Sequence, residues 1–172
     1  MLRGVASEGH YNSKNPSTGH NGFFLQKLES SDYNIVGTMA IAASDNPAGR
    51  ILGIIGMGQV GLAAGKRAVA LGMRVHYHGR SRKAAEIEES LGGATFHPEL
   101  KTMLEIADCV LLACPYNTTT HHILDKDAFA VMKRGVRIVN VGRGKCIDEA
   151  ALAEAIDLGI VAGAGLDVSY DE

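Results

Sequence analysis

Cysteine is scarce in this sequence, which contains only Cys109, Cys114 and Cys146, with no C-x-x-C pair among them. Disulfide frameworks and structural zinc sites need more cysteines, or closer spacing, than this. We therefore predict reduced and mostly buried thiols, no disulfide framework and no metal site.

Long apolar runs and a strong excess of one charge are also absent. No run approaches the ~18 residues that cross a membrane, and the first residues lack the apolar core of a signal peptide. The formal net charge of −2 gives no general attraction to nucleic acid or to an anionic membrane. These absences indicate a cytoplasmic protein with neither kind of partner. The length of 172 residues suits one domain with a buried core.

The sequence does contain a glycine-rich turn between an apolar segment and a helical pattern. Gly56, Gly58 and Gly61 fit G-x-G-x-x-G. In a dinucleotide-binding turn, the first glycine allows a sharp bend, the second lets a pyrophosphate approach the backbone, and the third lets the helix pack on the strand. The free N–H groups from Gln59 and Val60 onward would then point at the phosphates. A chance match among 21 glycines is the alternative, but the strand–helix–strand context favours dinucleotide binding.

Apolar segments of strand length alternate with helical patterns along the rest of the chain. We expect strands over residues 51–55, 74–78, 94–97, 109–113, 136–141 and 160–168, and helices over 60–71, 84–91, 98–107, 125–133 and 148–158. This alternation predicts an α/β fold, a doubly wound parallel sheet of the Rossmann type with strand order 3-2-1-4-5-6. The NAD(P)-binding domain would span residues 46–172. Residues 1–45 are largely polar and rich in turn-forming residues, which predicts a poorly ordered leader.

No acidic residue follows the second strand before Glu86. An NAD-specific site places a carboxylate at this point, where it accepts hydrogen bonds from the ribose 2′-hydroxyl. Arg80, Ser81 and Arg82 stand there instead, and arginine and serine side chains can donate to the oxygens of a 2′-phosphate. We predict that the site prefers NADP and that NAD remains possible. A solvated basic loop is the alternative.

Arg143 is the most informative residue near the end of a predicted strand, because it lies between two glycines just after the fifth. Ligands bind at the carboxyl ends of the strands in such a sheet. A guanidinium there can hold the carboxylate of a 2-keto acid with two hydrogen bonds and polarise its carbonyl. A surface arginine in a turn is the alternative.

The sequence resembles the coenzyme-binding domain of the D-isomer-specific 2-hydroxyacid dehydrogenases, and most of all their glyoxylate and hydroxypyruvate reductases. The resemblance covers about residues 47–172 and rests on the ordered segments Leu52–Gly61, Cys114–Pro115, Thr120–His121, Met132–Lys133, Asn140–Gly144, Asp148–Glu149 and Ala162–Val168. It implies an oxidoreductase that moves a hydride between NADP(H) or NAD(H) and a small 2-hydroxy or 2-keto acid such as glyoxylate or hydroxypyruvate. It also implies a homodimer.

The resemblance assigns coenzyme contacts to individual residues. The pyrophosphate would lie on Gln59 and Val60, and the adenosine ribose phosphate on the segment 80–82. The remaining coenzyme contacts would come from Cys114, Pro115, Thr120, Val141, Gly142, Arg143 and Asp167, of which Asp167 would hold the nicotinamide carboxamide.

The resemblance also assigns the chemistry. Arg143 would bind the substrate, and Glu172 would pair with a catalytic histidine and raise its pKa. A solvated terminal carboxylate is the alternative reading of Glu172. None of the seven histidines in the sequence matches the family's proton donor, which lies beyond Glu172.

Much of the family's second, substrate-binding domain is also expected to be missing, and residues 1–45 would be its remnant. Loss of a general acid lowers a rate by ~10²–10⁴, so we expect coenzyme binding with little or no turnover. Two alternatives stay open: a non-enzymatic dinucleotide-binding module, similar to corepressors that resemble this family, and an inactive truncated fragment.

Overall fold

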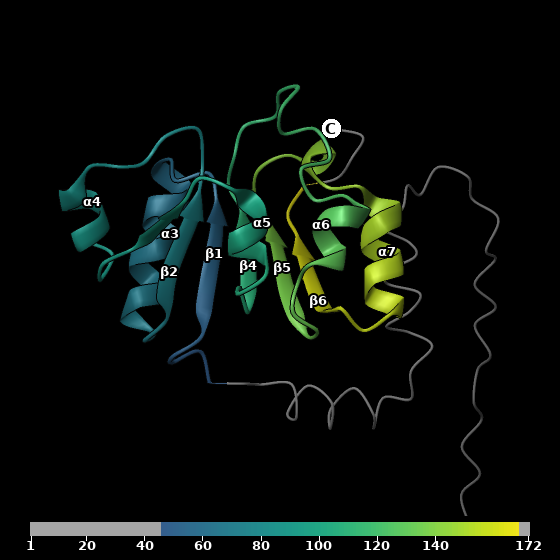
Figure 1. Ribbon diagram of the computed structural model, residues 1–172, viewed down its shortest axis with the longest axis horizontal. Helices are drawn as coiled ribbons and strands as arrows, with labels where there is room; N and C mark the ends of the chain where they lie inside the picture. Colours follow the sequence, from purple (N-terminus) through teal and green to yellow (C-terminus); the bar gives the residue numbers. More distant parts are fainter. Residues whose placement is uncertain (1–45, 169–172) are drawn as a thin grey trace, which may run out of the picture. The chain divides into compact units, whose positions relative to one another are not determined.

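The computed structural model describes residues 46–168. These residues form a parallel sheet with the strand order β3-β2-β1-β4-β5-β6, so the predicted fold and strand order are confirmed. All strands point their carboxyl ends toward the top of Figure 1. The strands are β1 (Ile51–Ile55), β2 (Arg74–His78), β3 (Thr95–His97), β4 (Cys109–Leu112), β5 (Val136–Asn140) and β6 (Val161–Leu166).

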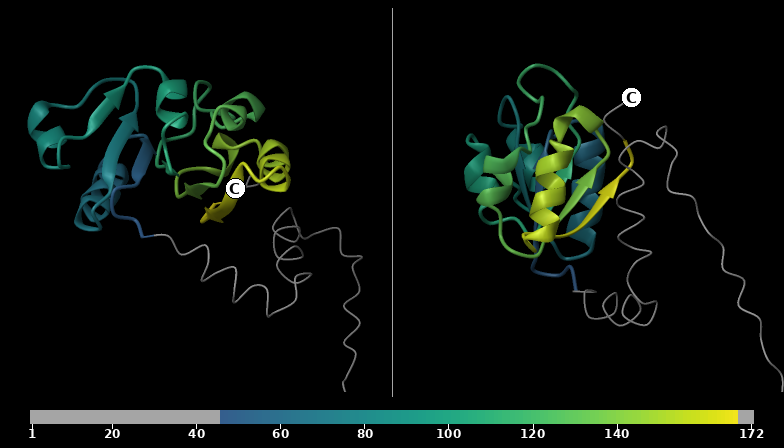
Figure 2. Two further views of the ribbon diagram at one scale, coloured as in Figure 1. Left: turned by 60° about the horizontal axis from the view of Figure 1, so that its bottom comes forward. Right: turned by 90° about the vertical axis from the view of Figure 1, so that its right-hand side faces the viewer.

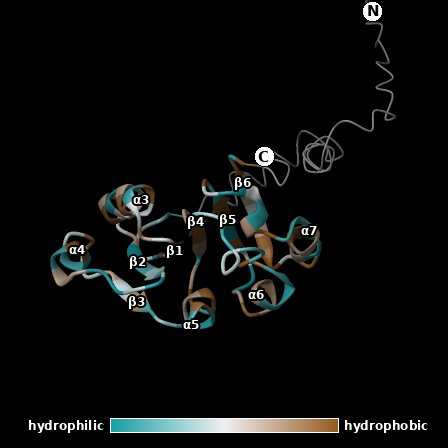
Figure 3. Cartoon of the chain, turned by 90° about the horizontal axis from the view of Figure 1, so that it is seen from above, coloured by the Kyte–Doolittle hydropathy of each residue, from teal (hydrophilic) through white to brown (hydrophobic). Residues whose placement is uncertain are grey.

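Helices cover both faces of the sheet. In the view from above, α3 and α4 lie on one side of the strands, and α5, α6 and α7 lie on the other (Figure 3). The views in Figure 2 show the same layers. The helices are α3 (Gln59–Ala70), α4 (Ala85–Glu89), α5 (Leu100–Leu104), α6 (Lys126–Ala130) and α7 (Glu149–Asp157), and a short 3-10 helix, η1 (Gly144–Cys146), follows β5.

The core lies on both faces of the central strands. Every residue of β1 is buried, as expected for a parallel strand that helices cover on both sides. One apolar cluster includes Leu112, Phe129 and Ile138, and a second, on the other face, includes Ile54 and Tyr77. The continuous apolar runs of the sequence therefore become the middle layer of the domain.

Local signals fix the ends of the longer helices. The carboxylate of Asp148 accepts hydrogen bonds from the N–H groups of Ala150 and Ala151 at 3.0 and 3.1 Å, so it caps α7. Gly159 adopts φ +70°, the left-handed conformation that commonly follows a helix end. No helix within residues 46–168 has the length and apolar character needed to cross a membrane.

Three predictions fall outside the described residues. They are the leader over residues 1–45, the last four residues of the predicted domain, and the role of Glu172.

Candidate functional site

The glycine turn after β1 leaves space where a ligand would approach. Gly56 adopts φ +97°, and a Cβ placed there would lie 2.8 Å from backbone atoms of Cys114. A Cβ on Gly61 would collide with the carbonyl oxygen of Gly56. A Cβ on Gly58, in contrast, would meet no atom within 4 Å. Packing therefore requires glycine at the first and third positions, whereas the second faces open space.

The amino end of α3 adjoins this open space. Its N-cap residue is Gly58, which supplies no side-chain hydrogen bond, and the first turn contains no acidic side chain. Gln59 and Val60 are exposed. The N–H groups of a first helical turn have no partners within the helix, and they carry a partial positive charge. The end of α3 therefore suits a pyrophosphate.

The ends of β4 and β5 are in close contact. A Cβ on Gly142 would lie 2.8 Å from the carbonyl oxygen of Cys114, so the turn after β5 lies directly against the residues that follow β4. The thiol of Cys114 lies 3.9 Å from that of Cys146. Burial, and then the neighbouring Cys146, raise the pKa of Cys114 to about 12. Cys114 is therefore a protonated packing residue at neutral pH.

Pro115 and Thr120 belong to the loop between β4 and α6. The hydroxyl of Thr120 donates to the carbonyl oxygen of Pro115 at 2.8 Å and accepts from the N–H of Asn117 at 2.8 Å. These two bonds make Thr120 a bridge within the loop. Pro115 is exposed and Thr120 is half-buried.

Arg143 is held by a polar residue that the sequence analysis did not single out. Asn140 is 1% exposed. Its amide nitrogen donates to the carbonyl oxygen of Arg143 at 3.0 Å, and its amide oxygen accepts from the N–H of Gly142 at 3.0 Å. Arg143 Nη1 donates to the carbonyl oxygen of Gly142 at 2.7 Å. The available signal is an uncharged polar side chain at the end of a mostly apolar strand.

Val141 and Asp167 adjoin the same turn. The N–H of Val141 donates to the carbonyl oxygen of Leu112 at 3.1 Å, and that of Asp167 donates to the carbonyl oxygen of Asn140 at 3.0 Å. Asp167 is exposed. The structure thus brings together, at one edge of the sheet, the predicted residues of the β1, β4, β5 and β6 ends.

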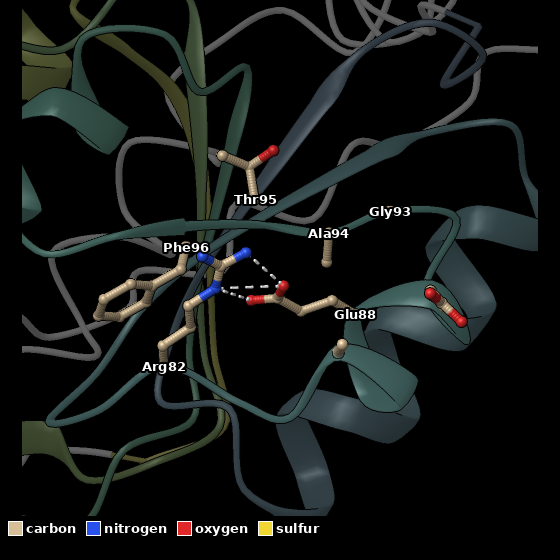
Figure 4. A pocket seen from close by; sticks show the side chains of 8 residues that line it. Arg82, Glu88, Gly93, Ala94, Thr95 and Phe96 are labelled. Atoms are coloured by element: carbon tan, nitrogen blue, oxygen red, sulfur yellow. Dashed lines mark hydrogen bonds and ion pairs between the residues drawn. The ribbon is translucent and has the colours of Figure 1, made fainter.

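The loop after β2 separates residues that the sequence analysis groups together. Arg80 and Ser81 are exposed, and the structure gives neither side chain a hydrogen bond or ion pair with another described residue. Arg82 instead donates from Nε and Nη2 to the carboxylate of Glu88, at 3.0 and 2.8 Å. Figure 4 shows this pair at the edge of a pocket. Arg82 is therefore committed to Glu88, whereas Arg80 and Ser81 remain available to a phosphate.

The described histidines lie in two groups. His76 Nδ1 and His97 Nε2 are 2.9 Å apart on β2 and β3, and burial lowers the pKa of both imidazoles. The rings of His121 and His122 stack at 4.0 Å in the loop after β4. Within residues 46–168, no cluster of three histidine, cysteine or acidic side chains could hold a metal ion.

Residues 20–172 match the family model described as D-isomer specific 2-hydroxyacid dehydrogenase, NAD binding domain. The chain is 43% identical over 127 residues to a 4-methyl-2-oxopentanoate reductase of Aspergillus oryzae, and 41% identical over 124 residues to a glyoxylate reductase of Pyrococcus horikoshii. These alignments cover 74% and 72% of this chain, but 37% and 36% of the relatives. The chain thus spans little more than a third of the length of these relatives.

The fold of this chain is also similar to that of a solved dehydrogenase structure. The apo form of a D-mandelate dehydrogenase from Rhodotorula graminis superimposes with a TM-score of 0.77 at 35% identity, covering 88% of this chain and 45% of that one.

Proposed function

We propose, since this chain belongs to the D-isomer-specific 2-hydroxyacid dehydrogenase family, that it binds NADP(H) in preference to NAD(H) and acts on a small 2-keto acid, glyoxylate or hydroxypyruvate. The observation that carries the proposal is the meeting of two features at one edge of the sheet. These are the uncapped amino end of α3 and the turn that carries Arg143.

The residues at this edge fit a nicotinamide dinucleotide. The space beside Gly58 and the free N–H groups of α3 suit the pyrophosphate. Asp167 and the loop of Pro115 and Thr120 would line the nicotinamide side. When bound, the nicotinamide supplies the hydride that reduces a keto carbon or accepts the hydride from the alcohol.

Arg143 would bind the substrate. A guanidinium presents paired N–H groups that match a carboxylate, and a positive charge near the keto oxygen stabilises the charge that develops there during reduction. Asn140 would hold the backbone of this turn in place through its two hydrogen bonds. The arrangement suits a 2-keto acid, in which carboxylate and carbonyl are adjacent.

The preference for NADP is supported by the loop after β2. Within that loop, Arg80 and Ser81 have exposed side chains that make no hydrogen bond or ion pair with another described residue, and the loop sequence offers no carboxylate to accept from a ribose 2′-hydroxyl. A 2′-phosphate would instead find a cation and a hydroxyl donor.

A fluorescence titration of the 172-residue chain with NADPH and with NADH tests the coenzyme assignment. We expect saturable binding of both, with the lower dissociation constant for NADPH. Assays with glyoxylate and hydroxypyruvate then test turnover. Because little or no turnover is expected of the 172-residue chain itself, these assays use a form extended to include the proton donor that the family resemblance places beyond Glu172. Binding without turnover in that form would support the non-enzymatic module instead, and absence of coenzyme binding would contradict both readings.

The homodimer is also proposed from membership in the family. Light scattering during size-exclusion chromatography measures the mass directly. A mass near twice the 18.2 kDa of one chain is expected, and a monomer at every concentration tested would contradict it.

A further inference from the structure

The carboxylate of Glu88 is the centre of a hydrogen-bond network between α4 and the loop after β2. Its side chain is only 9% exposed. The Tyr77 hydroxyl donates to Oε1 at 2.6 Å, while Arg82 donates from Nε and Nη2. Figure 4 shows the guanidinium of Arg82 directed at this carboxylate. A buried carboxylate with this many donors is stable only while they stay in place.

The same network holds the backbone of the loop. The hydroxyl of Tyr77, which itself is 1% exposed, accepts the N–H of Lys83 at 2.7 Å. Two consecutive residues are thus fixed, Arg82 through its side chain and Lys83 through its main chain. The exposed residues Arg80 and Ser81 directly precede this anchor.

The network pairs one cation of the loop, Arg82, with a carboxylate of the protein itself. Arg82, followed by the hydroxyl of Tyr77, lowers the pKa of Glu88 to about 2, so the carboxylate is ionised at every pH at which the protein would be used. If Arg82 turned toward another anion, it would leave a buried charge with fewer partners, which is unfavourable. The side chain of Arg80 makes no such ion pair with another described residue.

We propose that Glu88 is a positioning residue for the coenzyme: with Tyr77 and Arg82 it fixes the loop so that Arg80 and Ser81 bind the 2′-phosphate of NADP. This inference rests on the NADP preference proposed above. In this arrangement Arg82 serves the shape of the loop and Arg80 supplies the charge that distinguishes the two coenzymes. Fixing the backbone beside the donors before the ligand arrives removes part of the entropic cost of binding.

The test compares NADPH and NADH dissociation constants for the full chain and for Glu88→Gln. The variant keeps the size of the side chain and loses the charge that holds Arg82. We expect the NADPH dissociation constant to rise roughly tenfold, because Arg80 and Ser81 lose the anchor that follows them, and the NADH dissociation constant to change less than ~2-fold. Glu89→Gln is the matched control, because Glu89 is exposed on the same helix, and it should leave both constants unchanged.

Two results for Glu88→Gln would overturn the inference. An unchanged ratio of the two constants would mean that the network is only structural, even if the melting temperature falls. A lower dissociation constant for NADPH would mean that the released Arg82 binds the phosphate itself. If the wild-type chain shows no preference for NADPH, the proposed function fails instead, which separates the two failures.

Tyr77→Phe provides the same test should Glu88→Gln fail to fold. The substitution keeps the buried ring and removes the hydroxyl that contacts Glu88 and Lys83. A selective loss of NADPH affinity is expected, and a ratio equal to that of the wild type would overturn the inference. Circular dichroism confirms that the variants compared are folded.

Discussion

The side-chain amide of Asn140 bonds to both sides of Arg143, donating to the carbonyl oxygen of Arg143 and accepting from the N–H of Gly142. One buried side chain therefore holds the turn on which substrate binding is proposed to depend. The geometry of the turn is set from inside the domain, while the guanidinium is presented at the surface.

Replacing Asn140 with alanine should destabilise the domain by about 1–3 kcal/mol, because the substitution leaves two backbone groups without their partner. Urea unfolding followed by circular dichroism measures this loss. Asn140→Asp keeps the acceptor for Gly142 but buries a charge and sets a carboxylate oxygen against the carbonyl oxygen of Arg143, so it should be at least as destabilising as Asn140→Ala at neutral pH. A midpoint for Asn140→Ala equal to that of the wild type would contradict the prediction.

Substitution of Arg143 by glutamine should lower kcat/KM for glyoxylate by about 10²-fold or more, because the variant loses the charge that stabilises the developing oxyanion. The rate of NADPH oxidation at 340 nm, measured in a form of the protein that turns over, gives this value. The NADPH dissociation constant and the melting temperature should stay within error. Equal losses in coenzyme affinity and turnover would instead assign Arg143 to the coenzyme.

The glycines of the turn after β1 should respond in opposite ways to alanine. Gly61→Ala forces a methyl group into the carbonyl oxygen of Gly56, and overpacking of this kind costs about 1–3 kcal/mol. Gly58→Ala places its methyl in open space, so stability should change little while NADPH binding weakens. Thermal unfolding and fluorescence titration of both variants measure the contrast. Unchanged NADPH binding by Gly58→Ala would contradict the placement of Gly58 against the ligand.

Acid should remove the stability that Glu88 supplies. Its folded-state pKa is about 2 against an ordinary value of 4.5, so the unfolded chain binds this proton first as the pH falls. The contribution is complete above about pH 4.5 and is lost progressively between 4.5 and 2. The difference in unfolding free energy between the wild type and Glu88→Gln should shrink across this range, and a difference independent of pH would contradict the assignment.

The order of the strands could be predicted because the sheet depends on coarse features of the sequence. Apolar segments buried on both faces are continuous, and right-handed crossovers leave few arrangements. The ends of helices were harder to place. The segment 98–107 predicts a full helix, but α5 spans only Leu100–Leu104. Glu99 is extended at its start, and Thr102 donates to the carbonyl oxygen of Glu99.

Individual partners in the site could not be predicted in the same way. A cluster of cations indicates a phosphate, yet the sequence does not show that Arg82 lies against a carboxylate six residues later on α4. Such pairing depends on how the loop folds back onto the helix. The role of Asn140 likewise depends on a turn whose conformation the residue itself helps to fix.

The contacts of Gly56 and Gly142 with Cys114 have a mechanical consequence. Backbone meets backbone at both points, with no flexible side chain between the ends of β1, β4 and β5. The three strand ends therefore pack as one unit on the side where the dinucleotide is proposed to bind. This unit would set the distance between the pyrophosphate and nicotinamide sites, and the loops that follow the strands would adapt to the side chains of different 2-keto acids.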